Sequence, residues 1–191
     1  MVAQAANDLP DTAAQVFVLR SDMKGYEEVS EELRKYYPDC IIKTISCVTE
    51  GQAITAGIGL AALNELGETS GPITFGACDN GALYDIEKFN SLIDDGQTDV
   101  LVWCVRGYAN ASRKPGMFGW VDAAPDGLIK RISVKTPLDN PSIDPIVMGT
   151  FTFKKSKYFS DSLERLLERN GQMNGEFYID SLINDAIDLG Y

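Results

Sequence analysis

The sequence predicts a three-layer α/β domain, in which helices cover both faces of a mixed, mostly parallel sheet. In the first half, short apolar runs of strand length alternate with helical segments, which is the order that βαβ units produce. After Gly107, alternating segments separated by a turn composition indicate hairpin strands. A length of 191 residues suits one domain, and we expect residues 1–191 to form a single unit.

The first half begins with a short expected helix at residues 2–9, which Pro10 ends. Strands are expected where apolar and β-branched residues run together, and helices where small or charged residues precede a helix-ending proline or glycine. In order, these elements are strand 15–20, helix 25–37, strand 40–47, helix 51–66, strand 73–77, helix 86–93 and strand 99–105. The last of these, "DVLVWCV", is apolar on both faces and is therefore expected to be a central strand.

The second half is expected to start with a hairpin at residues 117–135, which turns at Pro125-Asp126-Gly127. A further strand is expected at residues 145–153. An amphipathic helix at residues 160–170 would have Ser160 or Asp161 as its N-cap, and a final helix covers residues 178–190.

Composition excludes several functions. The net charge of −11 repels polyanions, so we expect no sequence-independent nucleic-acid binding. The absence of histidine removes most zinc sites and every Ser-His or Cys-His mechanism. No apolar run approaches a membrane span of about 20 residues, and no signal peptide is recognisable, so we expect a cytoplasmic location without membrane contact. The thiols are expected to be reduced core residues. They are Cys40, Cys47, Cys78 and Cys104.

One polar stretch directly follows an apolar strand. The segment "PITFGACDNG" ends in Asp79, Asn80 and Gly81. In open α/β sheets, ligands bind beyond the carboxyl ends of the strands, which is where Asp79 is expected. Asp-Asn-Gly is also a strong turn composition, so both a ligand site and a plain turn explain it.

Four short motifs occur in a specific order: "TEGQA" before a helix, "ACDNG" after a strand, "VKTP" after a hairpin and "NGEFYID" at a helix start. This series resembles the sugar-phosphate nucleotidyltransferases over residues 2–191. The resemblance implies the Rossmann-like nucleotide-diphospho-sugar transferase fold. It also implies transfer of a nucleotidyl group from a nucleoside triphosphate to a sugar 1-phosphate, which yields a nucleotide-sugar and pyrophosphate. The expected partners are thus a nucleotide and a sugar phosphate.

By this resemblance, Glu50, Gly51, Gln52 and Asn80 would contact the nucleotide. Gly51 lacks a Cβ, so its backbone can come close to a ligand. The alternative is an ordinary helix N-terminus with Thr49 as its cap.

The resemblance further implies that Asp79 is the catalytic Mg²⁺ ligand and Lys135 a catalytic phosphate contact. Mg²⁺ prefers carboxylate oxygens together with phosphate and water, and it offsets charge that builds up on phosphate oxygens. The alternative for Lys135 is a solvated hairpin lysine. Val134 stands where the family usually has an acid that helps to hold the sugar, which leaves the substrate open.

Gly119, Gly149 and Glu176 would line the sugar pocket. The glycines could instead relieve crowding in strands. The neighbouring Asp180 could also accept a hydrogen bond from a sugar hydroxyl, or it could simply favour the helix N-terminus through the helix dipole. The two aromatic residues that follow Glu176 are expected in the core.

Two family features have no match in this chain: the glycine-rich triphosphate-binding loop after the first strand, and a second metal-binding Asp beyond Tyr191. We therefore expect missing flanking segments, a sheet without its first strand, and exposed strand edges that favour homo-oligomers.

These absences leave two alternatives to a nucleotidyltransferase. One is a non-catalytic nucleotide-sugar binding or regulatory module. The other is a glycosyltransferase of the same fold, which would need an Asp-x-Asp motif that Asp79-Asn80-Gly81 does not provide. The base and the sugar stay open, and surface-polysaccharide biosynthesis is an expectation from the family alone.

Overall fold

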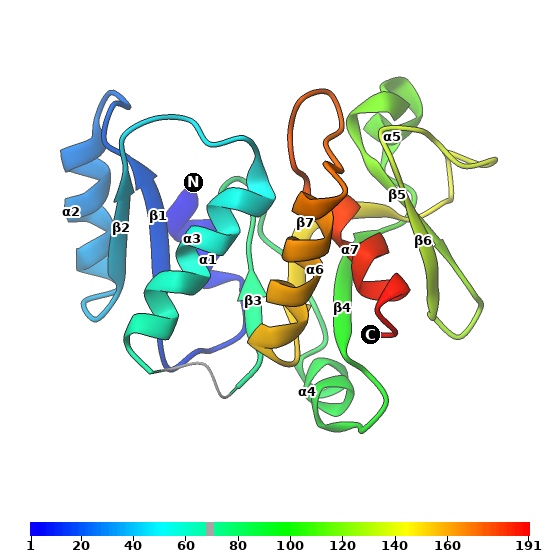
Figure 1. Cartoon of the computed structure of the whole chain (residues 1–191), viewed down its shortest axis with the longest axis horizontal. Coiled ribbons are helices and arrows are strands. Elements are labelled where there is room, and N and C mark those ends of the chain that lie inside the picture. Colours follow the sequence, from blue (N-terminus) through cyan, green and yellow to red (C-terminus); the bar gives the residue numbers. More distant parts are fainter. Residues whose placement is uncertain (68–70) are drawn as a thin grey trace.

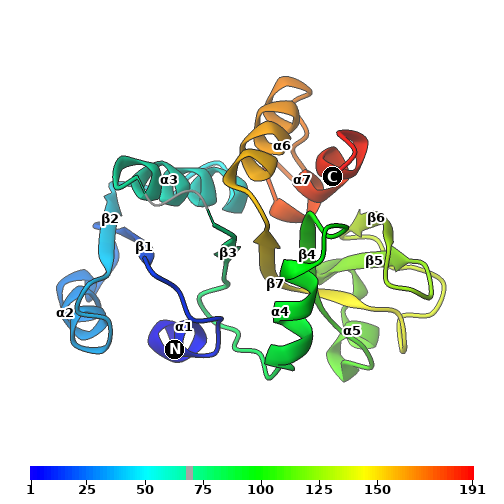
Figure 2. The same ribbon diagram turned by 90° about the horizontal axis from the view of Figure 1, so that it is seen from below.

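The computed structural model describes residues 1–67 and 71–191, which form three layers. Figure 2 shows helices on both sides of the strands. One outer layer consists of α3 (Gln52–Glu65), α6 (Ser156–Glu168) and α7 (Ile179–Asp188). The other consists of α1 (Val2–Asn7), α2 (Tyr26–Tyr36), α4 (Ile86–Asp94) and α5 (Ala109–Arg113). The predicted three-layer α/β architecture is confirmed.

The strands form two sheets. In the smaller one, β1 (Val16–Arg20) pairs in parallel with β2 (Ile41–Ile45). The five-stranded sheet contains β3 (Ile73–Phe75), β4 (Val100–Val105), β5 (Gly119–Ala123), β6 (Ile129–Val134) and β7 (Ile146–Phe153).

All pairings in the larger sheet are antiparallel: β7 pairs with β3, β4 and β5, and β5 pairs with β6. Parallel and antiparallel pairing therefore both occur, as expected, but in separate sheets, and the expectation of one mixed, mostly parallel sheet is wrong. The reason is the position of β7. After the β5–β6 hairpin, β7 runs back between β3 and β4 and is antiparallel to both. The strands β3 and β4 run in the same direction, but β7 separates them, so they do not pair with each other.

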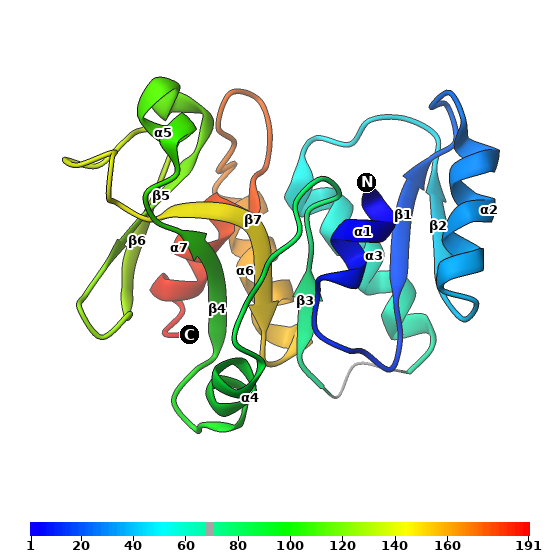
Figure 3. The ribbon, with the colours of Figure 1, turned by 180° about the vertical axis from the view of Figure 1, so that it is seen from behind.

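The two sheets do not join. Within the described residues, β1 pairs only with β2, and β3 pairs only with β7. In Figure 1, β1 and β3 lie next to each other without pairing, and α3 crosses one face of both strands. From behind, in Figure 3, α1 lies across the other face.

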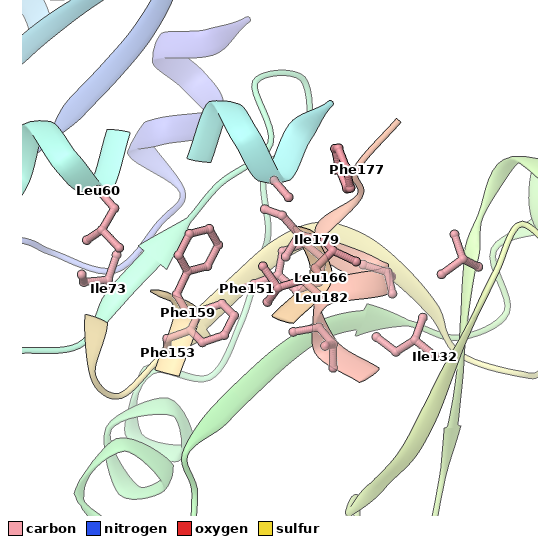
Figure 4. Close-up of a cluster of buried hydrophobic side chains, with 14 of the residues drawn as sticks. Leu60, Ile73, Ile132, Phe151, Phe153, Phe159, Leu166, Phe177, Ile179 and Leu182 are labelled. Atoms are coloured by element: carbon pink, nitrogen blue, oxygen red, sulfur yellow. The ribbon is translucent and has the colours of Figure 1, made fainter. Parts of the chain in front are cut away.

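The main core lies between β7 and the layer of α3, α6 and α7 (Figure 4). Phe151 and Phe153 of β7 are fully buried and meet Phe159 and Leu166 of α6, which are also fully buried. The rings of Phe153 and Phe159 pack edge to face at 5.3 Å. A second, smaller cluster forms around the buried Trp120, whose indole N–H donates to the Pro115 carbonyl at 2.9 Å.

The observed β4 differs from the expected central strand. In the part of the chain that the structure describes, its sole strand partner is β7. Its second apolar face is explained by an aromatic cluster, because Trp103 packs against Tyr84 at 4.7 Å and against Phe89 of α4 at 5.6 Å. The Trp103 indole also donates to the Thr152 hydroxyl at 3.0 Å. Covering side chains, not a second strand, thus account for the apolar pattern.

The start of α6 also differs from expectation. The helix begins four residues before Ser160, and neither Ser160 nor Asp161 is its N-cap. The Ser160 hydroxyl donates to the Ser156 carbonyl one turn earlier, as a serine inside a helix can. The short α5 and a 3₁₀ turn at Pro115–Met117 were not expected.

All four cysteines are free, as expected, but none is a core residue. Cys40 is partly buried, while Cys47, Cys78 and Cys104 are exposed. These three lie at or just beyond the carboxyl ends of β2, β3 and β4, where the strands stop packing against their neighbours.

Among the described residues, no helix has the length and apolar character needed to cross a bilayer.

Candidate functional site

The start of α3 is joined to the segment before α7 by backbone hydrogen bonds. The Phe177 N–H donates to the Glu50 carbonyl at 2.8 Å, and the Ala53 N–H donates to the Phe177 carbonyl at 2.9 Å. Between them, Gly51 has a φ of +131°, and a Cβ built on it would lie 2.5 Å from both the N and O atoms of Phe177. Only glycine permits this approach. The close neighbour that Gly51 accommodates is therefore another backbone segment.

The alternative interpretation of Thr49 as an N-cap is wrong. The N-cap position belongs to Gly51, and no side chain caps this helix. The Thr49 hydroxyl instead donates to the Gly51 carbonyl at 3.0 Å and pairs with the Thr55 hydroxyl at 2.6 Å. The side chains on either side of Gly51, those of Glu50 and Gln52, are exposed, and both residues stay predicted nucleotide contacts.

Asp79 and Asn80 lie in the loop that follows β3. Both are exposed, and the Asn80 amide donates to the Met148 carbonyl of β7 at 3.1 Å. Gly149 of β7 has a φ of +84°, and a Cβ there would lie 3.2 Å from the Cβ of Ala77. The loop is thus held against a bend in β7, at the carboxyl end of β3.

The residues around this loop would offer a magnesium ion only one or two protein ligands. Within the described chain, no group of three or more His, Cys, Asp or Glu side chains could enclose a metal. Asp79 offers one exposed carboxylate, and the Asp8 carboxylate packs against Gly81 in the same loop. Mg²⁺ commonly takes one or two carboxylates and completes its shell with phosphate and water. The donor set therefore suits a metal that arrives with a nucleotide.

A second cluster lies where β5 begins, β6 ends and α7 starts. The Lys135 ammonium donates to the Met117 carbonyl at 2.7 Å and lies 5.1 Å from the centre of the Tyr178 ring. The Tyr178 hydroxyl donates to the Glu176 carboxylate. The Asp180 carboxylate lies against Gly119, which leaves it room because it has no side chain: a Cβ at Gly119 would lie 2.1 Å from Asp180 Oδ2.

Two side chains of this cluster have strongly shifted pKa values. Burial raises the pKa of Asp180 to about 6, against the opposing influence of the Lys135 ammonium. The hydrogen bond to Glu176 raises the pKa of Tyr178 to about 12. Near neutral pH, Asp180 can therefore exist in both protonation states, and it can donate or accept a hydrogen bond. Such a group, next to a lysine, suits the recognition of hydroxyl and phosphate groups.

The two clusters are connected. The Val147 side chain contacts Gly119, since a Cβ there would lie 3.3 Å from Val147 Cγ2, and the next residue of β7 holds Asn80. On the other side, Glu176 precedes the Phe177 that contacts Gly51. Figure 1 shows the start of α3 and the α6–α7 connection at the same edge of the molecule. The chain segments that carry the predicted residues are thus linked through β7 and through the contact of Gly51 with Phe177.

Sequence reasoning missed one member of the second cluster, Tyr178, and left the role of another, Asp180, open. Tyr178 was expected in the core but is only partly buried, with its hydroxyl on Glu176. For Asp180, a sugar contact and the helix dipole are both open from the sequence; its carboxylate lies against Gly119 and is influenced by the Lys135 charge. The available signal was the position of Asp180 four residues after Glu176 in the same motif, whereas its contact with Gly119 could not be read from the sequence.

This arrangement of sheets and helices defines a nucleotidyltransferase fold of the kind found in sugar-nucleotide pyrophosphorylases. The nucleoside-diphosphate-sugar pyrophosphorylase from Vibrio cholerae RC9 superposes with a TM-score of 0.66 at 21% identity, over 92% of this chain and 68% of that chain.

Two structures of UDP-glucose pyrophosphorylase are also similar, each at 15% identity. The apo form gives a TM-score of 0.58 over 96% of this chain and 73% of that chain. The complex with UDP-glucose gives 0.59 over 97% and 73%. No protein-family model and no curated protein matches the sequence. At these identities the similarity shows the fold.

Proposed function

We propose that the chain is a sugar-phosphate nucleotidyltransferase domain, which binds a nucleotide and a sugar phosphate at the edge described above. The observation that supports the proposal is the link through Val147 and Met148 of β7, which joins the loop of Asp79 and Asn80 to the cluster of Gly119, Asp180 and Lys135. The UDP-glucose complex of one similar protein supports the choice of ligand class.

The residues of the candidate site would contact different parts of the substrates. Glu50 and Gln52, whose side chains are exposed at the start of α3, would face the base beside Gly51. Lys135 would turn from the Met117 carbonyl to a phosphate oxygen, because its ammonium is held by a single backbone acceptor in the described chain. Glu176 and the glycine pair Gly119 and Gly149 would border the sugar.

Asp79, with Asp8 nearby, would hold Mg²⁺. When bound, the ion would supply positive charge to the phosphate oxygens. The protein's own contribution is to align the two substrates and to place the Lys135 charge beside them. No covalent nucleophile on the protein is required for a nucleotidyl transfer of this kind.

A second candidate is a non-catalytic module that binds a nucleotide-sugar. The observation in its favour is that Lys135 is the sole cation among the predicted site residues, whereas a triphosphate in transit needs several positive groups. Neither proposal specifies the base or the sugar. The nucleotidyltransferase proposal includes a role in the synthesis of polysaccharide precursors in the cytoplasm.

Calorimetry with Mg²⁺ and a panel of nucleotide-sugars that starts with UDP-glucose tests ligand binding. We expect one panel member to bind, and Lys135→Ala and Asp79→Asn each to weaken it at least tenfold. Asp39→Asn, which changes an exposed acid far from the site, should leave it unchanged. Binding that is insensitive to both site variants, or no binding at all, would refute the proposal.

Release of pyrophosphate from a triphosphate and a sugar 1-phosphate separates the two candidates. Turnover that Asp79→Asn abolishes supports the nucleotidyltransferase. Binding of the nucleotide-sugar without any pyrophosphate release supports the module.

A further inference from the structure

Lys135 has a left-handed backbone conformation, with a φ of +59°. In the part of the chain that the structure describes, the other non-glycine residues with positive φ are Asn170 and Asn174, and the short polar side chain of asparagine tolerates this region. A lysine has no such local help. Residues in this conformation persist only where their surroundings hold them, and they gather at functional sites. Neighbouring contacts must therefore hold Lys135 in place.

The turn at residues 115–118 supplies these contacts. The Phe118 carbonyl accepts a hydrogen bond from the Lys135 N–H at 3.0 Å, and the Met117 carbonyl accepts one from the Lys135 ammonium at 2.7 Å. A Cβ built on Gly116 would lie 3.7 Å from the Lys135 carbonyl oxygen, so the turn also lies against that side of the residue. The backbone and the charged group of Lys135 are thus both attached to one turn.

Trp120 anchors this turn. Its indole N–H donates to the Pro115 carbonyl at 2.9 Å, and its side chain is fully buried in the small cluster with Ala111 and Ile146. Within the turn, the Phe118 N–H reaches the same carbonyl at 3.4 Å, which is long for a hydrogen bond. The Pro115 carbonyl is therefore held mainly by the tryptophan.

The Trp120 ring lies on the opposite side of β5 from the candidate site. Side chains alternate along a strand, and the preceding residue, Gly119, faces the Asp180 carboxylate. The Trp120 ring instead packs in the cluster that contains Ala111 of α5. A ligand beside Lys135 would not touch this ring, so any effect of Trp120 on binding must pass through the turn.

We propose that Trp120 is a positioning residue for Lys135: its indole N–H fixes the turn at residues 115–118, and the turn keeps the Lys135 ammonium beside the phosphate of a bound ligand. The ammonium then has only to rotate from the Met117 carbonyl to a phosphate oxygen. A lysine that is free in solution loses more rotamer freedom when it binds. The phosphate contact itself rests on the proposed function.

NMR tests the positioning without a ligand. In the unaltered chain, ¹³C relaxation should show less motion at Cε of Lys135 than at Cε of Lys130, which is exposed on β6. Trp120→Phe removes the indole donor and leaves an aromatic ring, and it should raise the mobility of Lys135 to that of Lys130.

The second tryptophan of the chain provides a matched control. The Trp103 indole N–H also makes one hydrogen bond, to the Thr152 hydroxyl at 3.0 Å. Trp103→Phe therefore removes the same donor group from another place, and it should leave the motion of Lys135 unchanged. Urea denaturation of both variants shows that each is folded.

Calorimetry with Mg²⁺ and the same panel of nucleotide-sugars measures the consequence for binding. Trp120→Phe should weaken binding by about fivefold, which is the effect of ordering one long side chain, and Trp103→Phe should not. Because Trp120 acts through Lys135, the double variant Trp120→Phe/Lys135→Ala should bind as Lys135→Ala does. A merely structural tryptophan would weaken both backgrounds equally.

The outcomes separate this inference from the proposed function. If the unaltered chain binds no panel member, the proposed function is wrong and this inference falls with it. If the chain binds but Lys135 stays ordered in Trp120→Phe, or the effects of the two substitutions add, only the positioning role is overturned. If Trp120→Phe does not fold, the unaltered chain decides, because a Lys135 as mobile as Lys130 would overturn the proposal and a restrained one would support it.

Discussion

Replacing Gly51 by alanine perturbs the backbone contact that joins α3 to the start of α7. The added Cβ would lie 2.5 Å from the N and O atoms of Phe177, at a φ of +131°. Strain at a backbone conformation that side chains disfavour costs about 1–3 kcal/mol. The hydrogen bonds from Phe177 to Glu50 and from Ala53 to Phe177 contribute about 1 kcal/mol each. Together, these effects predict a loss of about 4 kcal/mol in the free energy of unfolding.

Urea denaturation followed by circular dichroism measures this loss by linear extrapolation. Two glycines provide controls. Gly107 has a φ of +69° and open space around it, so Gly107→Ala should cost only about 1 kcal/mol. Gly96 has open space and no positive φ, so Gly96→Ala should cost nothing measurable. If Gly51→Ala costs no more than Gly107→Ala, the reasoning about the Phe177 contact is wrong.

Three further predictions concern α6 and α7. Arg169→Ala removes a two-point hydrogen bond, at 2.6 and 2.8 Å, from the buried Asp185, and should lower the free energy of unfolding by about 2 kcal/mol in urea denaturation. Asn184→Ala removes an amide that pairs with both backbone groups of Ile132, at 2.7 and 2.9 Å, and should cost about 2 kcal/mol by the same measurement. Asp180→Asn should flatten the dependence of stability on pH, as denaturation at pH 4, 6 and 8 would reveal.

The sign of the last prediction follows from proton binding. Burial raises the pKa of Asp180 from 3.8 to about 6, so the folded chain holds this proton more tightly than the unfolded chain. Its stabilising contribution is fully present below about pH 4 and is lost as the pH rises through about 6. Asp180→Asn should therefore remove a decline in stability over this interval. If stability declines with pH in Asp180→Asn as it does in the unaltered chain, the raised pKa of Asp180 is not the cause. If Arg169→Ala or Asn184→Ala keeps full stability, the reasoning about that residue's hydrogen bonds is wrong.

Local patterns predicted most of the elements. The α2, α3 and β7 segments, for example, start and end within one or two residues of the expected bounds, because proline, glycine and apolar periodicity act over short distances. The start of α6 was missed, since Ser160 is both a good cap and, with its hydroxyl on the Ser156 carbonyl, an acceptable interior residue. Residues 68–70, just before β3, lie outside the described part of the chain.

Properties that depend on distant residues could not be read from the sequence in the same way. The separation of the sheets depends on which edges meet, and the antiparallel pairing depends on where β7 inserts. At the candidate site, the motifs located residues at one edge, but the contact of Asp180 with Gly119 joins positions far apart in the chain. The roles of Asp79, Lys135 and the other site residues stay predictions.

The division between the sheets has a consequence for cooperativity. Within the described chain, β1, α2 and β2 share no ladder with the five-stranded sheet. Proteins open in units that coincide with such supersecondary groups, each with its own opening free energy. We therefore expect the amino-terminal group of β1, α2 and β2 to open separately from the five-stranded sheet, at a lower concentration of denaturant.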